Sequence, residues 1–139
     1  MPSWMSSGFS AWNGQSSVTG ISFQPAAAGE EPTIGVYQTD STALSDGCIG
    51  ESASKGQIYP NSTFMGRTNT GQSTVAIAHE VGHILGLDDQ PQNTTPPGIM
   101  NKGTGPCATA TSTATAVTSS DAANATQCNK KAVQCHTTS

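Results

Sequence analysis

The segment with the strongest folding signal in this chain is residues 74–87, which has the pattern of an amphipathic helix. Its apolar face repeats with the 3.6-residue helical period: Val75, Ala78, Val81 and Leu85. Ser73 or Thr74 can cap the first turn, and Gly86 stands where a left-handed turn would end the helix. We therefore predict a helix that stops at Gly86.

This helix carries the sequence HEVGH, in which two histidines four residues apart enclose a glutamate. At about 100° per residue, His79 and His83 lie roughly 40° apart around the axis and one turn apart along it. Two imidazoles so placed can reach one zinc ion. Glu80 is rotated by about 100° from His79, which keeps it off the metal but next to a metal-bound water. Its position suits a general base.

A catalytic zinc ion usually has three protein ligands and one open position. In a continuous helix, Asp89 would point away from the two histidines. A reversal at Gly86 would bring the third residue after it back toward the metal, which makes Asp89 the candidate ligand. Its neighbour Asp88 remains the alternative.

Other third ligands fit less well. No glutamate follows Glu80, so a ligand of that type on a later helix is not available. His136 lies three residues from the end of a Thr/Ser tail and reads as a surface histidine. Asp121 falls in the first turn of a predicted helix, where a carboxylate interacts favourably with the helix dipole.

The sequence HEVGHILGLDD resembles the metzincin metallopeptidase signature HExxHxxGxxH/D. It is similar to the version with a third Asp ligand, as in the small snapalysin-like neutral proteases secreted by bacteria. The resemblance implies that His79, His83 and Asp89 bind zinc, that Glu80 is the general base and that Gly86 is the turn residue.

Metzincins also place a methionine-containing turn below the metal. Residues 98–101 read Gly-Ile-Met-Asn and resemble that turn, with Met100 as the candidate methionine. The resemblance implies an α+β, metzincin-like zincin fold: a small twisted mixed β-sheet with an N-terminal helix, an active-site helix and a C-terminal helix. Only three residues precede Trp4, so either the usual first strand is missing or the chain is a fragment. A tyrosine after the methionine turn, which some metzincins use, is absent.

The other predicted elements follow from local pattern and turn residues. Helices are expected at residues 4–13 and 120–134, the second capped by Ser120. Strands are expected at residues 18–23, 33–38 and 56–59, the first two as neighbours, and residues 90–105 read as loop. A peptide substrate would add to an edge strand somewhere in residues 43–59.

The large aliphatic and aromatic side chains are too few for a thick core. Leu, Ile, Val and Phe total only 19 of 139 residues, so we expect one domain, residues 1–139, supplemented by metal or disulfides. The four cysteines fit two disulfides in an exported protein, with reduced thiols as the alternative: Cys48, Cys107, Cys128 and Cys135. Cys128 and Cys135 would be about 10.5 Å apart along one helix, which is too far to pair. Each should therefore join Cys48 or Cys107.

The charge pattern excludes two classes of partner. Five basic residues, clustered only at Lys130 and Lys131, do not make a nucleic-acid or anionic-membrane surface. No apolar run approaches membrane-spanning length, and no signal peptide is visible in this chain. We expect a secreted, monomeric zinc endopeptidase acting on peptide or protein substrates. The alternatives are a metal-stabilised binding or structural domain with little or no activity, and a truncated piece of a longer metallopeptidase.

Overall fold

The computed structural model describes residues 3–36, 57–58, 70–88, 90, 98–101 and 117–130. These residues are mainly helical, with two short strands. In chain order the elements are α1 (Ser3–Asn13), α2 (Ser16–Thr19), β1 (Gly35–Val36), β2 (Gln57–Ile58), α4 (Thr70–Ile84) and α5 (Ser119–Lys130). No helix in the described part of the chain is both long and apolar enough to cross a bilayer.

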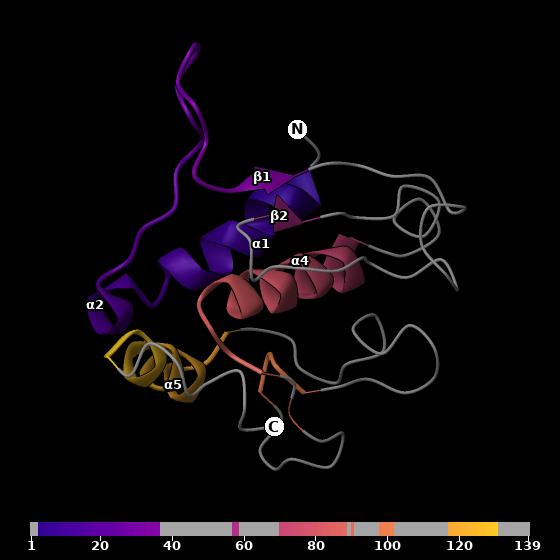
Figure 1. The fold of residues 1–139 in the computed structure, drawn as a ribbon. Coiled ribbons are helices and arrows are strands. Elements are labelled where there is room, and N and C mark those ends of the chain that lie inside the picture. Colours follow the sequence, from indigo (N-terminus) through magenta and orange to yellow (C-terminus); the bar gives the residue numbers. More distant parts are fainter. Residues whose placement is uncertain are drawn as a thin grey trace.

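Helix α1 packs along α4, and this pair forms the centre of the fold (Figure 1). The predicted helix at residues 4–13 is confirmed, and its apolar face is turned inward: Met5 and Trp12 are buried and Phe9 is half-buried. Gly8 permits the close approach, since a Cβ at this position would overlap the Ile77 side chain of α4. At Gly8 the backbone of α1 therefore packs directly against α4.

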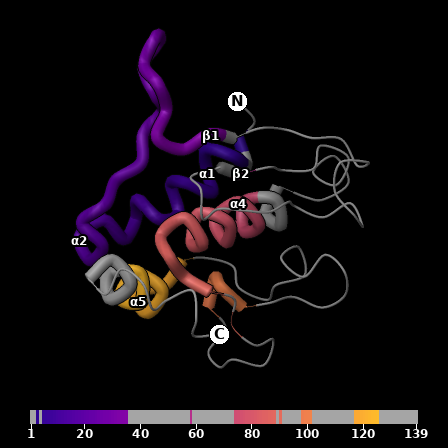
Figure 2. The backbone as a smooth tube through the Cα atoms, viewed as in Figure 1, coloured from indigo at the N-terminus to yellow at the C-terminus, as the bar shows by residue number. Residues whose placement is uncertain are grey.

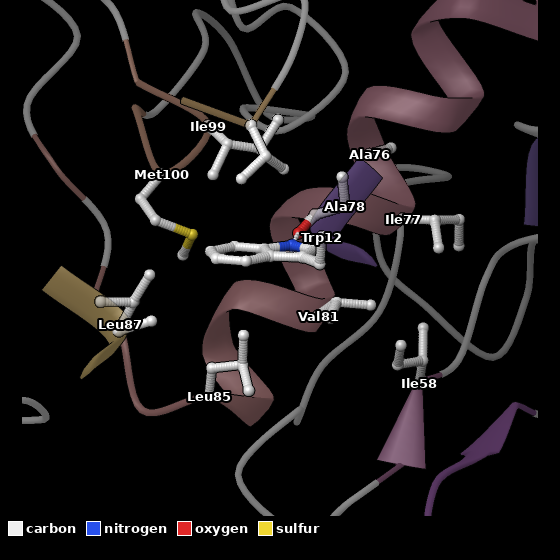
Figure 3. Close-up of a cluster of buried hydrophobic side chains, with 12 residues drawn as sticks. Trp12, Ile58, Ala76, Ile77, Ala78, Val81, Leu85, Leu87, Ile99 and Met100 are labelled. Atoms are coloured by element: carbon white, nitrogen blue, oxygen red, sulfur yellow. Dashed lines mark hydrogen bonds between the residues drawn. The ribbon is translucent and has the colours of Figure 1, made fainter. Parts of the chain in front are cut away.

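Among the residues that the structure describes, Trp12 is the largest fully buried side chain. Its indole Nε1 donates a hydrogen bond of 2.8 Å to the Ala78 carbonyl oxygen, in the middle of α4. Figure 3 shows the indole ring with Met100 beside it and with Ala78 and Val81 of α4 close by. Trp12 is thus buried in the core and its indole N–H has a hydrogen-bond partner there. It supplies much of the apolar volume in a chain that has few large apolar residues.

The two strands within the described residues pair in parallel, with Gly35 opposite Gln57 and Val36 opposite Ile58. These segments lie within the strands expected at residues 33–38 and 56–59. The larger twisted mixed sheet is not seen among the described residues, which are dominated by four helices. Ile58 is completely buried and belongs to the core cluster, so the pair packs on the same core as α4.

The prediction of a strand at residues 18–23 is wrong. Residues 16–19 form α2, which ends at Gly20 in a left-handed conformation with φ of 71°. The Asn13 side chain then takes both backbone groups of Phe23: Nδ2 donates to the carbonyl (2.8 Å) and Oδ1 accepts from the amide (2.6 Å). These two bonds tie Phe23 to the end of α1, and residues 20–23 belong to neither a helix nor a strand. Figure 2 shows that the chain runs outward after α2 and returns to β1.

Two helix starts differ from the sequence prediction. Helix α4 begins at Thr70, so neither Ser73 nor Thr74 caps it. Helix α5 begins at Ser119, and Thr118 is its capping residue in place of Ser120: Thr118 Oγ1 accepts from the Asp121 amide at 3.2 Å. Asp121 does lie in the first turn, as predicted. Residues 131–134 of the predicted helix lie outside the described part of the chain.

Candidate metal centre

The two histidines of α4 point their Nε2 atoms at each other. These nitrogens are 3.1 Å apart, and the rings are nearly perpendicular with centroids separated by 4.8 Å. Two imidazoles that bind one zinc ion at about 2.0–2.1 Å in tetrahedral geometry have nitrogens about 3.3 Å apart. The observed separation therefore matches a shared metal ligand pair.

The orientation of each histidine ring is fixed by a hydrogen bond at its other nitrogen, Nδ1. Nδ1 of His79 lies 2.8 Å from the Ile99 carbonyl oxygen, and Nδ1 of His83 lies 2.7 Å from the Leu87 carbonyl oxygen. A carbonyl oxygen only accepts, so each Nδ1 must carry the hydrogen, and in a neutral ring Nε2 then carries a lone pair. Two lone pairs at 3.1 Å repel unless a positive charge lies between them, either a proton on one ring or a metal ion bound by both. The donor set therefore fits zinc.

The partner of His83 is supplied by the turn that ends α4. Gly86 has φ of 91°, its amide donates to the His83 carbonyl (2.9 Å), and the Leu87 amide donates to the Gly82 carbonyl (3.0 Å). This is the Schellman pattern of hydrogen bonds. The predicted reversal at Gly86 is confirmed, and it brings the Leu87 carbonyl back over the last turn to meet the His83 ring.

The partner of His79 comes from the turn at residues 98–101. The Asn101 amide donates to the Gly98 carbonyl (3.1 Å), and the Gly98 amide donates to Asn101 Oδ1 (3.2 Å). Ile99 and Met100 are buried at the tip of this turn. Met100 packs so closely on α4 that a Cβ at Gly82 would overlap its sulfur. The methionine thus lies below the helix that carries both histidines.

Glu80 lies on α4 next to His79, and Asp88 follows the turn that ends the helix. Glu80 is only 6% exposed and His79 only 2%, whereas His83 is half-buried and is the more exposed of the two histidines. Asp88 is half-buried, and Asp89 lies outside the described residues. The choice between Asp88 and Asp89 as ligand therefore stays a prediction.

A complete ligand set is not assembled within the described residues: no three His, Cys, Asp or Glu side chains gather there. His136, Cys48, Cys107 and Cys135 lie outside them, as does most of the proposed substrate edge at residues 43–59. Only the backbone of Cys128 is described, within α5.

The groups that hold the two histidine rings could not be predicted from residue type. The Ile99 and Leu87 carbonyls are backbone atoms and leave no mark on residue type. Asp121 is 6% exposed and its carboxylate oxygens accept from the Ile99 amide at 3.2 and 3.3 Å, a contact that its helical position did not suggest. The spacing of Thr118 and Asp121 does indicate a helix cap. It does not indicate the contact from Asp121 to the Ile99 amide.

Comparison with protein-family models, with curated proteins and with solved structures finds no match for this chain.

Proposed function

We propose that this protein is a zinc-dependent endopeptidase in which His79, His83 and Asp89 hold the metal and Glu80 is the general base. One observation carries the proposal: two imidazoles with hydrogen-bonded Nδ1 atoms face each other through Nε2 atoms 3.1 Å apart. Histidines held in this way are typical of metal ligands, because the second hydrogen bond sets both the tautomer and the ring orientation.

The backbone is anchored on both sides of the two candidate aspartates. Leu87 is held by its amide bond to Gly82 and by its carbonyl bond to His83. The Gln90 amide donates to the Met100 carbonyl at 2.8 Å, below α4. Asp88 and Asp89 both lie between these two anchors in the sequence, and Asp89 is preferred because the metzincin signature has its third ligand at that position. A carboxylate in this place would also reduce the net charge of the site.

Zinc bound at this site would supply a Lewis acid for the scissile carbonyl and for the attacking water. Glu80, adjacent to His79 in sequence and nearly buried, takes the proton from that water. It then delivers the proton to the nitrogen of the leaving amine, so that the peptide bond breaks without expelling an amide anion. Because His83 is more exposed than His79, we expect a peptide to approach from the side of His83.

We also propose a metzincin-like arrangement for the whole chain. It is supported by the chain order of α1, a parallel strand pair, the histidine helix α4, a methionine-bearing turn below it, and α5. The Ser/Thr-rich composition and the four cysteines support a secreted protein stabilised by two disulfides. The monomeric state stays a prediction.

The test combines metal analysis with peptide cleavage on one preparation. The purified protein should contain about one zinc per chain, cleave members of a diverse peptide library, lose activity with 1,10-phenanthroline and regain it with zinc. Glu80→Gln should keep the zinc and lose activity by about 10²–10⁴-fold, the usual contribution of a general base. Glu31→Gln, an exposed acid changed in the same way, is the matched control and should be fully active.

The outcomes separate the candidate functions. Full activity in Glu80→Gln would remove Glu80 from the mechanism. Bound zinc without cleavage of any peptide would support the metal-stabilised binding domain. A preparation that binds no zinc would contradict both.

A further inference from the structure

The carboxylate of Asp121, in the first turn of α5, contacts the turn at residues 98–101 below the candidate metal centre. It accepts from the Thr118 amide (2.8 Å), from Thr118 Oγ1 (2.9 Å) and from the Ile99 amide (3.2 and 3.3 Å to its two oxygens). Asp121 is 6% exposed and Ile99 is completely buried. A buried carboxylate with three donors is held firmly in place.

Gly98 is needed for this contact. A Cβ at Gly98 would lie 2.7 Å from Asp121 Oδ1, which is closer than side chains tolerate. A larger residue there would push the carboxylate away from the Ile99 amide. The glycine and the aspartate, from separate segments, therefore fit each other around one backbone amide.

The same residue, Ile99, faces His79 with its other backbone group. Its amide donates to Asp121, and its carbonyl accepts from Nδ1 of His79 at 2.8 Å. His83 differs, because its carbonyl partner belongs to Leu87, in the turn that continues α4 itself. The orientation of His79 depends on a second segment, whereas that of His83 does not.

We propose that Asp121 is a positioning residue for His79: by fixing the Ile99 backbone, it aims the His79 ring at the metal. This proposal rests on the metal site proposed above. Asp121 itself touches neither metal nor substrate. It gives α5 a role in the site beyond packing, since the first turn of α5 holds the carbonyl that selects the Nδ1–H form of His79.

The test compares Asp121→Ala with Thr118→Ala as the matched control. Both remove capping interactions from α5, but Thr118→Ala keeps the backbone amide at position 118 and the bond from Asp121 to Ile99. We expect Asp121→Ala to weaken zinc affinity by about tenfold, the lower end for loss of an outer partner of a metal-bound histidine. Its cobalt-substituted form should show a shifted visible spectrum. Thr118→Ala should leave both unchanged. Asp121→Asn, which keeps one oxygen acceptor, should fall between the two and serves if Asp121→Ala does not fold.

A second measurement uses metal-free protein, so that the positioning role is tested even if the zinc site fails. In histidine-labelled protein, nuclear magnetic resonance would follow exchange of the two Nδ1 hydrogens with solvent. Asp121→Ala and Asp121→Asn should speed exchange at His79 several-fold and leave His83 unchanged. Equal effects at both histidines, or equal effects of Asp121→Ala and Thr118→Ala, would overturn the proposal. Absence of zinc binding in the unaltered protein, with the His79 effect intact, would instead overturn the proposed function alone.

Discussion

Replacing Gly82 with alanine tests how closely the methionine turn is packed beneath the histidine helix. The new Cβ would overlap the Met100 sulfur and would lie 3.3 Å from both Met100 Cε and Trp12 Cζ2. Trp12 is 1% exposed and is held by its bond to Ala78, so the Met100 side chain must give way. We therefore predict that Gly82→Ala is destabilising even though alanine favours helices.

The magnitude follows from two opposing effects. Overpacking a filled core costs about 1–3 kcal/mol, and replacing glycine by alanine within a helix recovers about 1 kcal/mol. The net loss in free energy of unfolding should be about 1 kcal/mol, with an upper limit near 2 kcal/mol. Removing Met100 alone should cost about 2–5 kcal/mol, because it leaves a cavity in the core.

A double-mutant cycle in urea, measured without metal, gives the decisive number. In Gly82→Ala with Met100→Ala the new methyl group occupies space vacated by the methionine, so the double variant should be more stable than the sum of the single losses by about 1 kcal/mol. The urea m-values should stay equal across the four proteins, so that midpoints report stability. Additivity within about 0.3–0.5 kcal/mol would show that Gly82 and Met100 are not in contact and would refute the reasoning.

Three further changes address other contacts. Gly86→Ala should lower the free energy of unfolding by about 1–2 kcal/mol, because φ of 91° is strained for any residue with a Cβ, and it should also weaken zinc binding. Gly14→Ala, where a Cβ would make only ordinary contacts, is the control and should change neither. Equal urea midpoints for the two variants would contradict this prediction. Trp12→Phe removes the hydrogen bond to the Ala78 carbonyl and should lower stability in urea by at least about 1 kcal/mol, so an unchanged midpoint would deny that bond a role. Chelation of zinc should lower the melting temperature, by an amount equivalent to about 4 kcal/mol when zinc had been present at 1,000 times its Kd; a melting curve indifferent to chelator would mean that the folded state binds no metal.

Where the signal was local, the structure agrees with prediction. The helical periods of α1 and α4, the left-handed turn at Gly86 and the position of Asp121 in the first turn of α5 were all predictable, because backbone geometry over a few residues determines them. Predictions failed where a distant or unexpected partner competed. Where a strand was expected at residues 18–23, the chain forms helix α2 up to Thr19, and the Asn13 side chain bonds the backbone of Phe23.

The spacing of His79, Glu80 and His83 is a property of the chain, because an α-helix repeats every 3.6 residues whatever surrounds it. The chain alone does not determine which ring nitrogen of each histidine faces the other, because the hydrogen bonds to the Leu87 and Ile99 carbonyls orient the rings. The Leu87 carbonyl is positioned by the turn at Gly86 that ends α4. The Ile99 carbonyl arrives only when residues 98–101 fold under α4 and Asp121 secures them, and hydrogen bonds between such distant segments form only on folding.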